Sequence, residues 1–168
     1  TREPGGTPIG ERIRSIILDR DCAEMDDMTE AMLYAAARAQ HVAQVIRPAL
    51  LAGKIVICDR FVDSSIAYQG YGRGLGEAVS VINDYAVCGC LPDVTFLMKM
   101  DPRVGRRRIN VQQQDRLERE KDDFHVRTYE GYLELEKKYP GRIVGIDAAR
   151  SIEEIKIDIY KKLEEVLK

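Results

Sequence analysis

The sequence predicts an α/β fold in which a parallel sheet lies between layers of helices. Three apolar runs, residues 54–59, 94–100 and 142–147, have the length and composition of buried strands. Segments with helical spacing separate these runs, and strands separated by such helices form right-handed βαβ crossovers. No linker or repeat divides the chain, so we expect a single domain over residues 1–168.

The first helices are predicted from their caps. Thr7 is suited to N-cap a helix after the N-terminal loop, because its hydroxyl can accept a hydrogen bond from the first turn. A longer helix is predicted to start near Asp27, where Asp27-x-x-Glu30 resembles a capping box. We expect it to bend or loosen near Pro48, which has no backbone N–H, and to stop at Gly53.

The remaining elements follow from the same signals. A loop and a short helix come after the first strand. We expect helices over residues 77–88, 101–109 and 122–139, a polar loop over residues 110–118, and a last helix to residue 167 capped by Ser151 and Glu154.

Composition excludes several classes of protein. The 168 residues are 45% apolar and carry a net charge of −2, which allows a core and lacks the basic excess of a nucleic-acid binder. No apolar run reaches the roughly 18 residues of a spanning helix, so we expect a cytoplasmic protein without a membrane partner. The pair Cys88 and Cys90 could bind a soft metal, but reduced buried thiols are the favoured interpretation.

Two candidate functional residues, Asp59 and Arg60, lie where the first predicted strand ends. In open α/β sheets, ligands bind at the carboxyl edge of the strands. A carboxylate at such an edge commonly holds Mg²⁺ in phosphoryl-transfer proteins, and the planar guanidinium of an arginine matches phosphate oxygens. A surface salt bridge at a strand end is the alternative for the dipeptide alone.

Four ordered segments make the chain resemble the bacterial thymidylate kinases. They are TREPGGT at residues 1–7, YAAARAQ at 34–40, the stretch from Asp59 to Gly74 that ends in GYGRG, and QDRLE at 114–118. The resemblance implies the P-loop NTPase fold of the nucleoside-monophosphate kinases, with three layers and a parallel sheet. It also implies transfer of a phosphoryl group from ATP to dTMP, giving dTDP for dTTP synthesis, with Mg²⁺.

The resemblance assigns residues to the phosphate end of the acceptor. It implies that Arg60 and Arg2 grip the phosphate of dTMP, where two guanidinium groups would orient it for in-line attack. Asp59 is the candidate Mg²⁺ ligand, directly or through water. Glu3 is a second acidic group at the same edge, although Glu3-Pro4 could serve mainly to shape the loop.

The resemblance also assigns residues to the base and sugar. Tyr34 would stack on thymine and Arg38 would hydrogen-bond a base carbonyl; the two lie one helical turn apart and so share a face. Ser65 and Gln69 would lie near the polar edge of the base. Tyr68 would crowd the 2′ position of the sugar and favour deoxyribose. Without the resemblance, Tyr34 is equally a core residue and Arg38 a solvated charge.

A lid is expected over about residues 106–119. Three consecutive arginines end at Arg108, and a polar segment leads to Arg116. In phosphate-transferring kinases, an arginine on a mobile loop can close over the donor and stabilise the transferred group. We predict this catalytic role for Arg116 and, as the weaker candidate, Arg108. The alternative is that these arginines only form the solvated face of a helix.

The donor half of the site is missing from the sequence. No Gly-x-x-x-x-Gly-Lys-[Ser/Thr] phosphate loop occurs in the 168 residues. The family carries it on a first strand and helix, and that strand lies between those matching residues 54–59 and 94–100. We therefore expect that this N-terminal segment is absent from the chain, and that the chain alone is inactive.

Two further expectations concern assembly and activity. The resemblance implies a homodimer through the helix of residues 27–51, whose Ala35, Ala39, Val42 and Ile46 would serve a core equally well. The alternatives to thymidylate kinase activity are another nucleoside-monophosphate kinase, or an inactive nucleotide-binding or scaffolding protein that dispenses with the phosphate loop.

Overall fold

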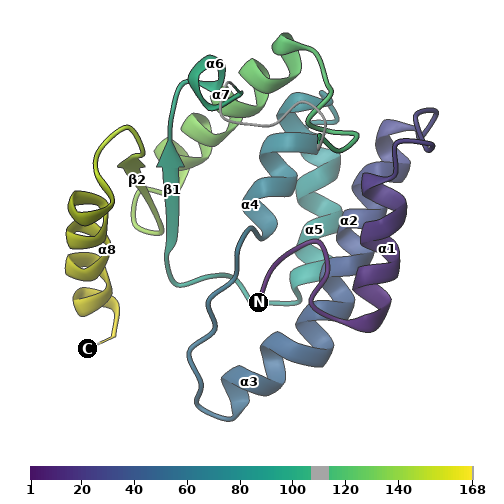
Figure 1. The fold of residues 1–168 in the computed structure, drawn as a ribbon. Helices are drawn as coiled ribbons and strands as arrows, with labels where there is room; N and C mark the ends of the chain where they lie inside the picture. Colours follow the sequence, from purple (N-terminus) through teal and green to yellow (C-terminus); the bar gives the residue numbers. More distant parts are fainter. Residues whose placement is uncertain (107–113, 168) are drawn as a thin grey trace.

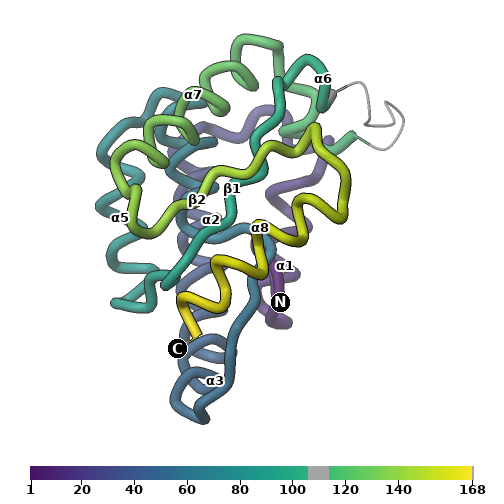
Figure 2. Tube along the Cα trace, turned by 90° about the vertical axis from the view of Figure 1, so that its left-hand side faces the viewer, coloured from purple at the N-terminus to yellow at the C-terminus, as the bar shows by residue number. Residues whose placement is uncertain are grey.

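Two parallel strands form the sheet in the part of the chain that the computed structural model describes, residues 1–106 and 114–167. Strand β1 (Thr95–Lys99) pairs with β2 (Ile143–Asp147) in a register that sets Thr95 opposite Ile143. The strands predicted over residues 94–100 and 142–147 are thereby confirmed. Helix α8 (Ile152–Val166) covers one side of the pair, whereas α1 and α2 lie on the far side of the molecule (Figures 1 and 2).

The predicted strand over residues 54–59 is wrong as a regular strand. The segment runs extended between α3 and α4 (Figure 1), but its one ladder contact in the described residues is an isolated parallel bridge between Asp59 and Arg2. A strand needs a partner along its length to satisfy its backbone groups. Here Ile55 and Ile57 are 69% and 81% exposed, so the apolar pattern that predicted a strand is largely uncovered.

The helical layer farthest from the sheet contains α1 (Pro8–Leu18) and α2 (Asp27–His41). The Thr7 cap is confirmed, because its hydroxyl accepts from Gly10 N at 2.9 Å. The capping box predicted at Asp27 and Glu30 is wrong. Asp26 is the N-cap and accepts from the amides of Met28 and Thr29, which leaves Glu30 beyond the third helical position, buried among other partners.

The long second helix loosens near Pro48, as predicted. A π-helical turn, η1 (Val42–Ile46), joins α2 to the short α3 (Arg47–Leu51). Pro48 has no N–H to give to a carbonyl one turn earlier, so the regular ladder is interrupted in this region. Gly53, with φ +70°, follows the end of α3 in the left-handed conformation that glycine adopts without strain.

The centre of the molecule is built from α4 (Val62–Ser65), η2 (Ile66–Gly72), α5 (Glu77–Val87) and α7 (Asp122–Lys138). Close approach of η2 and α7 depends on glycine. A Cβ at Gly131 would lie 2.7 Å from the Tyr71 ring, and one at Gly72 would lie 2.6 Å from Thr128 Oγ1. The predicted helices over 77–88 and 122–139 are thus confirmed within one residue at their ends.

The remaining elements agree with the sequence where they are described. Helix α6 (Pro102–Arg106) begins as predicted, but its predicted end and most of the polar loop lie outside the described residues. Ser151 and Glu154 form the predicted capping box of α8. Among the described helices, none has the length and apolarity required to cross a membrane.

A partly buried ion pair connects α4 to the sheet. Both oxygens of Asp63 accept from the guanidinium of Arg142, at 2.7 and 2.6 Å, and Thr95 Oγ1 donates to Asp63 at 2.9 Å. Arg142 precedes β2 and Thr95 begins β1. The segment that carries Asp59 and Arg60 is therefore fastened to both strands just beyond that motif.

Candidate active site

A cavity of about 300 Å³ opens among α2, α4, η2 and the N-terminal loop. It gathers residues that are far apart in the sequence, including Asp59 and every residue predicted to bind dTMP. Those lining residues are Arg2, Glu3, Tyr34, Arg38, Arg60, Ser65, Tyr68 and Gln69. The structure brings these side chains together, and their roles in binding stay predictions.

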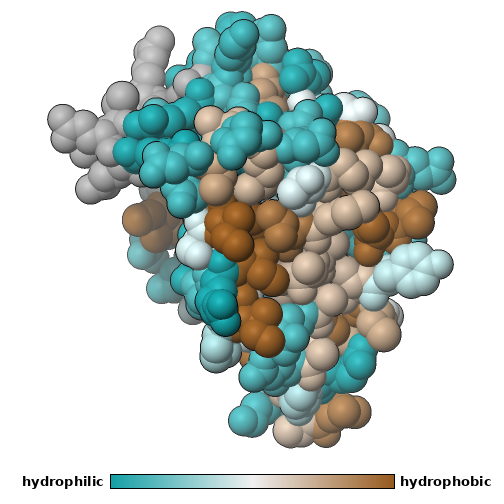
Figure 3. Space-filling view, turned by 90° about the vertical axis from the view of Figure 1, so that its right-hand side faces the viewer, coloured by the Kyte–Doolittle hydropathy of each residue, from teal (hydrophilic) through white to brown (hydrophobic). Residues whose placement is uncertain are grey.

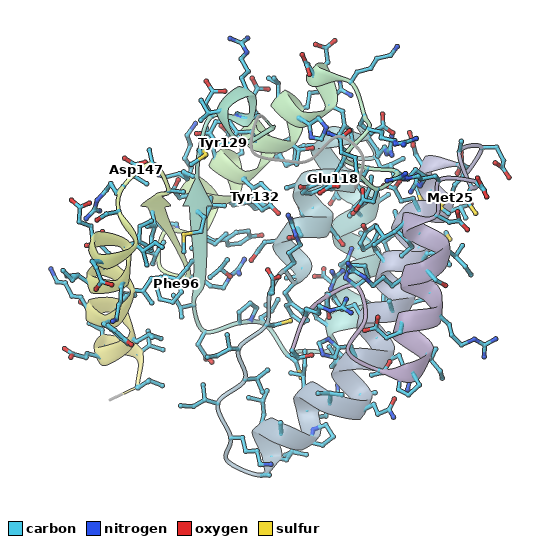
Figure 4. The ribbon with its side chains drawn as sticks, in the orientation of Figure 1. Met25, Phe96, Glu118, Tyr129, Tyr132 and Asp147 are labelled. Atoms are coloured by element: carbon cyan, nitrogen blue, oxygen red, sulfur yellow. The ribbon has the colours of Figure 1, made fainter. Side chains whose placement is uncertain are left out.

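Of the two predicted lid arginines, Arg116 is described and does not line this cavity. Arg116 donates to the Ile17 carbonyl at 3.0 Å and to the Glu30 carboxylate at 2.5 Å, and it is absent from the cavity lining. Its neighbours Asp115, Leu117 and Glu118 line the cavity instead. Arg108 lies outside the described residues. Figure 4 labels Glu118 where this segment passes above α4 and α2.

Arg38 is 1% exposed and held at the cavity wall by three side chains. Its Nε donates to Glu3 at 2.8 Å, and its Nη1 donates to Ser65 at 2.9 Å and also to Asn83. These bonds fix the plane of the guanidinium and leave Nη2 as the nitrogen with which it can donate to a ligand. Asn83 has no sequence signal of its own and was missed.

Glu3, predicted as a second acidic group at this edge, is buried and hydrogen-bonded to Arg38. It is 4% exposed, and its second oxygen lies 2.8 Å from Nδ1 of His41, which is fully buried. Nε2 of His41 in turn lies 2.8 Å from Thr1 Oγ1. His41 was not singled out in the sequence analysis, although its place three residues after Arg38 on one helix puts both on the same face.

Arg60, which lines the cavity, has an unusual backbone conformation. Its φ of +63° lies in the left-handed region, which costs a non-glycine residue on the order of 1 kcal/mol. The guanidinium carbon lies 5.4 Å from the centroid of the Tyr68 ring. Electrostatic interaction with Tyr68 raises the pKa of Arg60, so the group is a permanent cation. This backbone outlier makes Arg60 a candidate functional residue.

Arg2 lies beside Arg60 on the adjacent loop, where an isolated bridge joins Arg2 to Asp59. Its guanidinium is about half exposed and donates to Glu11 at 3.0 Å and to the Pro4 carbonyl at 3.2 Å. Arg14 also donates to the Pro4 carbonyl, at 3.0 Å, and lines the cavity. Arg14 is a third cation that the sequence motifs did not single out.

Tyr34 and Tyr68, together with Phe61, provide aromatic surface in the cavity. Burial, with the charge of Glu30 as a second cause, raises the pKa of Tyr34, so its phenol stays neutral. Tyr68 meets the rings of Phe124 and Tyr132 edge-on, with centroids 6.0 and 6.3 Å away. These contacts hold the Tyr68 ring in one orientation at the wall.

Glu30 is a buried carboxylate beneath the cavity. It is fully buried and accepts from Gln69 at 2.8 Å, from Arg73 at 2.9 Å and from Arg116. Burial alone would raise the pKa of Glu30, but the hydrogen bonds from Arg73 and Gln69 lower it below the ordinary value, so the group is ionised. The sequence pattern had assigned Glu30 to a helix cap.

A second, larger cavity of about 750 Å³ adjoins the first. Its walls include Ile55 and Ile57 on one side and Phe96 and Met98 of β1 on the other, and its lining is mostly apolar. Figure 4 labels Tyr132 in the region between β1 and α4 and Phe96 beside β1. Both cavities share residues at their junction, namely Asp59, Arg60, Phe61, Ser64, Tyr68 and His125.

The junction offers a carboxylate to a metal but no prebuilt metal cage. In residues 1–106 and 114–167, no group of three or more His, Cys, Asp or Glu side chains is placed to hold a metal ion. Mg²⁺ usually takes only one or two protein carboxylates and completes its shell with substrate phosphates and water. The exposed Asp59 at the junction fits that requirement.

Comparison with known proteins identifies the family. The family model described as Thymidylate kinase matches residues 1–159. A thymidylate kinase of Halalkalibacterium halodurans is 50% identical over 171 positions, covering 99% of this chain and 81% of the relative. One from Lactobacillus helveticus is 52% identical with the same coverage, and one from Latilactobacillus sakei is 54% identical over 92% of this chain and 74% of the relative. The chain therefore belongs to the thymidylate kinase family.

Proposed function

We propose that the protein transfers a phosphoryl group from ATP to dTMP, giving dTDP, and that the smaller cavity takes dTMP. Membership of the thymidylate kinase family supports the reaction. The observation that carries the assignment of the cavity is that all eight residues predicted for dTMP line it together. The other nucleoside-monophosphate kinases and the inactive scaffold are not favoured by relatives that carry the name thymidylate kinase.

The charges around the cavity support one orientation of the nucleotide. Arg60, Arg2 and Arg14 concentrate positive charge near Asp59, which suits a dianionic phosphate. Arg38 and Gln69 face the cavity from the buried side of α2 and η2, which suits the polar edge of a base. Tyr34 and Tyr68 supply surface for the base and sugar between these ends.

ATP and Mg²⁺ are proposed to enter from the junction with the larger cavity. Asp59 would hold the ion, which neutralises phosphate charge and orients the two nucleotides for in-line transfer. Arg60 would hold the acceptor phosphate and disperse charge on it. Closure of a lid over about residues 106–119 would exclude water, and for Arg116 to act on the donor it would have to leave Glu30.

The larger cavity supports the proposal that a further strand belongs beside β1. In the described residues β1 pairs on one edge only, and apolar side chains of the segment 54–59 face the same space without cover. A parallel strand there would satisfy both sets of backbone groups. We propose that this strand leads into the phosphate loop for ATP. Without it, residues 1–168 are expected to bind dTMP but not to catalyse phosphoryl transfer.

A homodimer is proposed through the outer face of α2, with a correction to the residues involved. Ala35, Val42 and Ile46 of the predicted set are buried in the core. The exposed face instead has apolar residues at heptad spacing, continued by two residues of α5. These residues are Met32, Ala36, Ala39 and Ala43, with Val81 and Tyr85. Figure 3 shows brown and tan residues running together over this side of the molecule.

Steady-state assays test the reaction. In a protein that includes the proposed phosphate loop, initial rates with ATP and Mg²⁺ are expected to be highest for dTMP when dTMP, dUMP, dGMP and AMP are compared. Calorimetry of residues 1–168 is expected to show dTMP binding without ATP binding. Rapid turnover by residues 1–168 alone would refute the proposed origin of the phosphate loop, and preference for a purine monophosphate would refute the assigned substrate.

Sedimentation tests the dimer separately. Ala39→Arg places a charge in the centre of the exposed face of α2 and is expected to give monomers. Lys156→Ala, on the exposed face of α8, serves as the control and is expected to leave the dimer intact. A wild-type protein that sediments as a monomer at micromolar concentration would contradict the proposed interface.

A further inference from the structure

The carboxylate of Glu30 determines how the side chain of Gln69 is presented. An ionised carboxylate only accepts hydrogen bonds, so the amide nitrogen of Gln69 must face it. The structure has this arrangement, with Gln69 Nε2 donating to Glu30 at 2.8 Å. The opposite rotamer would set two oxygens against each other inside the protein, which is strongly unfavourable.

The other end of the Gln69 amide is left for a ligand. Gln69 lines the smaller cavity and is 1% exposed. Its Oε1 is buried and has no hydrogen-bond partner among the described residues. A buried acceptor without a partner costs about 1–3 kcal/mol, a cost that a ligand N–H would remove. Arg38 contributes the complementary donor through Nη2.

We propose that Glu30 is a positioning residue that sets base specificity by holding Gln69 as an acceptor. This inference rests on the proposed function of the cavity. An acceptor from Gln69 beside a donor from Arg38 matches a pyrimidine that has an N3–H and a 4-oxo group. A 4-amino pyrimidine presents the reverse pattern, with an unprotonated N3. The pair Glu30 and Gln69 thus rejects cytosine-type bases.

The test compares two nucleotides that differ only in this pattern. Calorimetry gives Kd for dTMP and for 5-methyl-dCMP, which shares the methyl group, sugar and phosphate. In Glu30→Gln the partner of Gln69 can donate as well as accept a hydrogen bond. The side-chain amide of Gln69 can therefore rotate and exchange its oxygen and nitrogen positions. We expect the ratio of Kd for 5-methyl-dCMP to Kd for dTMP to fall about tenfold in this variant. A change of this size corresponds to the loss of one neutral hydrogen bond.

A matched variant separates positioning from general damage. Glu120 also pairs with Arg73, at 2.6 Å, but does not contact Gln69 in the structure. Glu120→Gln is expected to leave the ratio unchanged. Gln69→Leu is expected to lower the ratio, and adding Glu30→Gln to it should change the ratio no further. An unchanged ratio in Glu30→Gln would overturn the proposal, as would full additivity with Gln69→Leu.

Two further measurements cover the case in which Glu30→Gln does not fold. Glu30→Asp keeps the charge that Arg73 and Arg116 require but withdraws it from Gln69, and it is also expected to lower the ratio. In the wild-type protein, the side-chain amide protons of Gln69 should exchange slowly with solvent, as followed by NMR, both with and without dTMP. Fast exchange of these protons in both states would refute the hydrogen bond to Glu30. Failure of the wild-type protein to bind dTMP at all would instead refute the proposed function.

Discussion

Glu3→Gln is expected to destabilise the protein strongly because it removes the charge that compensates a buried arginine. Arg38 and Glu3 have side chains that are both 2% exposed, and their atoms lie 2.8 Å apart. Breaking a buried ion pair by removing one partner typically costs about 3–5 kcal/mol. Glutamine can still accept one hydrogen bond, and Ser65 and Asn83 continue to accept from Arg38. We therefore expect a loss of about 2–4 kcal/mol in the free energy of unfolding.

Urea denaturation followed by circular dichroism measures this change, and thermal melts provide a second reading. For a chain of this length, 1 kcal/mol corresponds to roughly 2–4 °C in Tm, so a fall of about 6–12 °C is expected for the middle of the range. Glu134→Gln is the control, because Glu134 pairs with Lys137 on the exposed surface and its removal should leave the midpoint unchanged. Equal midpoints for Glu3→Gln and the control would refute the compensating role of Glu3.

Three other outcomes follow from the site and its supports. Because the pKa of Glu30 is lowered on folding, its contribution to stability is complete above the ordinary value near 4.5 and is lost as pH falls through the lower folded value. In Glu30→Gln, the free energy of unfolding measured by denaturation should therefore depend less on pH between about pH 5 and pH 3 than it does in the wild-type protein. Arg60→Gly should remove left-handed strain and leave the free energy of unfolding unchanged or raised by up to about 1 kcal/mol. In a protein that includes the proposed phosphate loop, kcat/KM for dTMP should fall at least about 10²-fold; a clear loss of stability in this variant, or an unchanged kcat/KM, would contradict the prediction. Asp63→Asn should lower the free energy of unfolding by about 2–4 kcal/mol, and a double-mutant cycle with Arg142→Met should show coupling between the two residues. Additive effects of the two substitutions would show that the ion pair contributes little to stability.

The elements with local signals were predictable. Thr7, with its hydroxyl before a proline-started helix, and the Ser151–Glu154 box capped helices as expected, because these hydrogen bonds form within a few residues. The loosening near Pro48 was predictable for the same reason. Glu30 shows the limit of such patterns. Its spacing from Asp27 matched a capping box, yet Gln69, Arg73 and Arg116, all distant in sequence, determine where its carboxylate lies.

The sequence by itself determined the family, the predicted set of dTMP residues and the type of most helices, because short motifs and periodicity are properties of neighbouring residues. Tertiary structure alone decided how those residues are supported. It placed Glu3 and His41 behind Arg38, bound Arg116 to Glu30, and left residues 54–59 without a ladder partner in the described chain. Burial, long-range hydrogen bonding and strand pairing depend on which segments meet in space, and no local pattern records that.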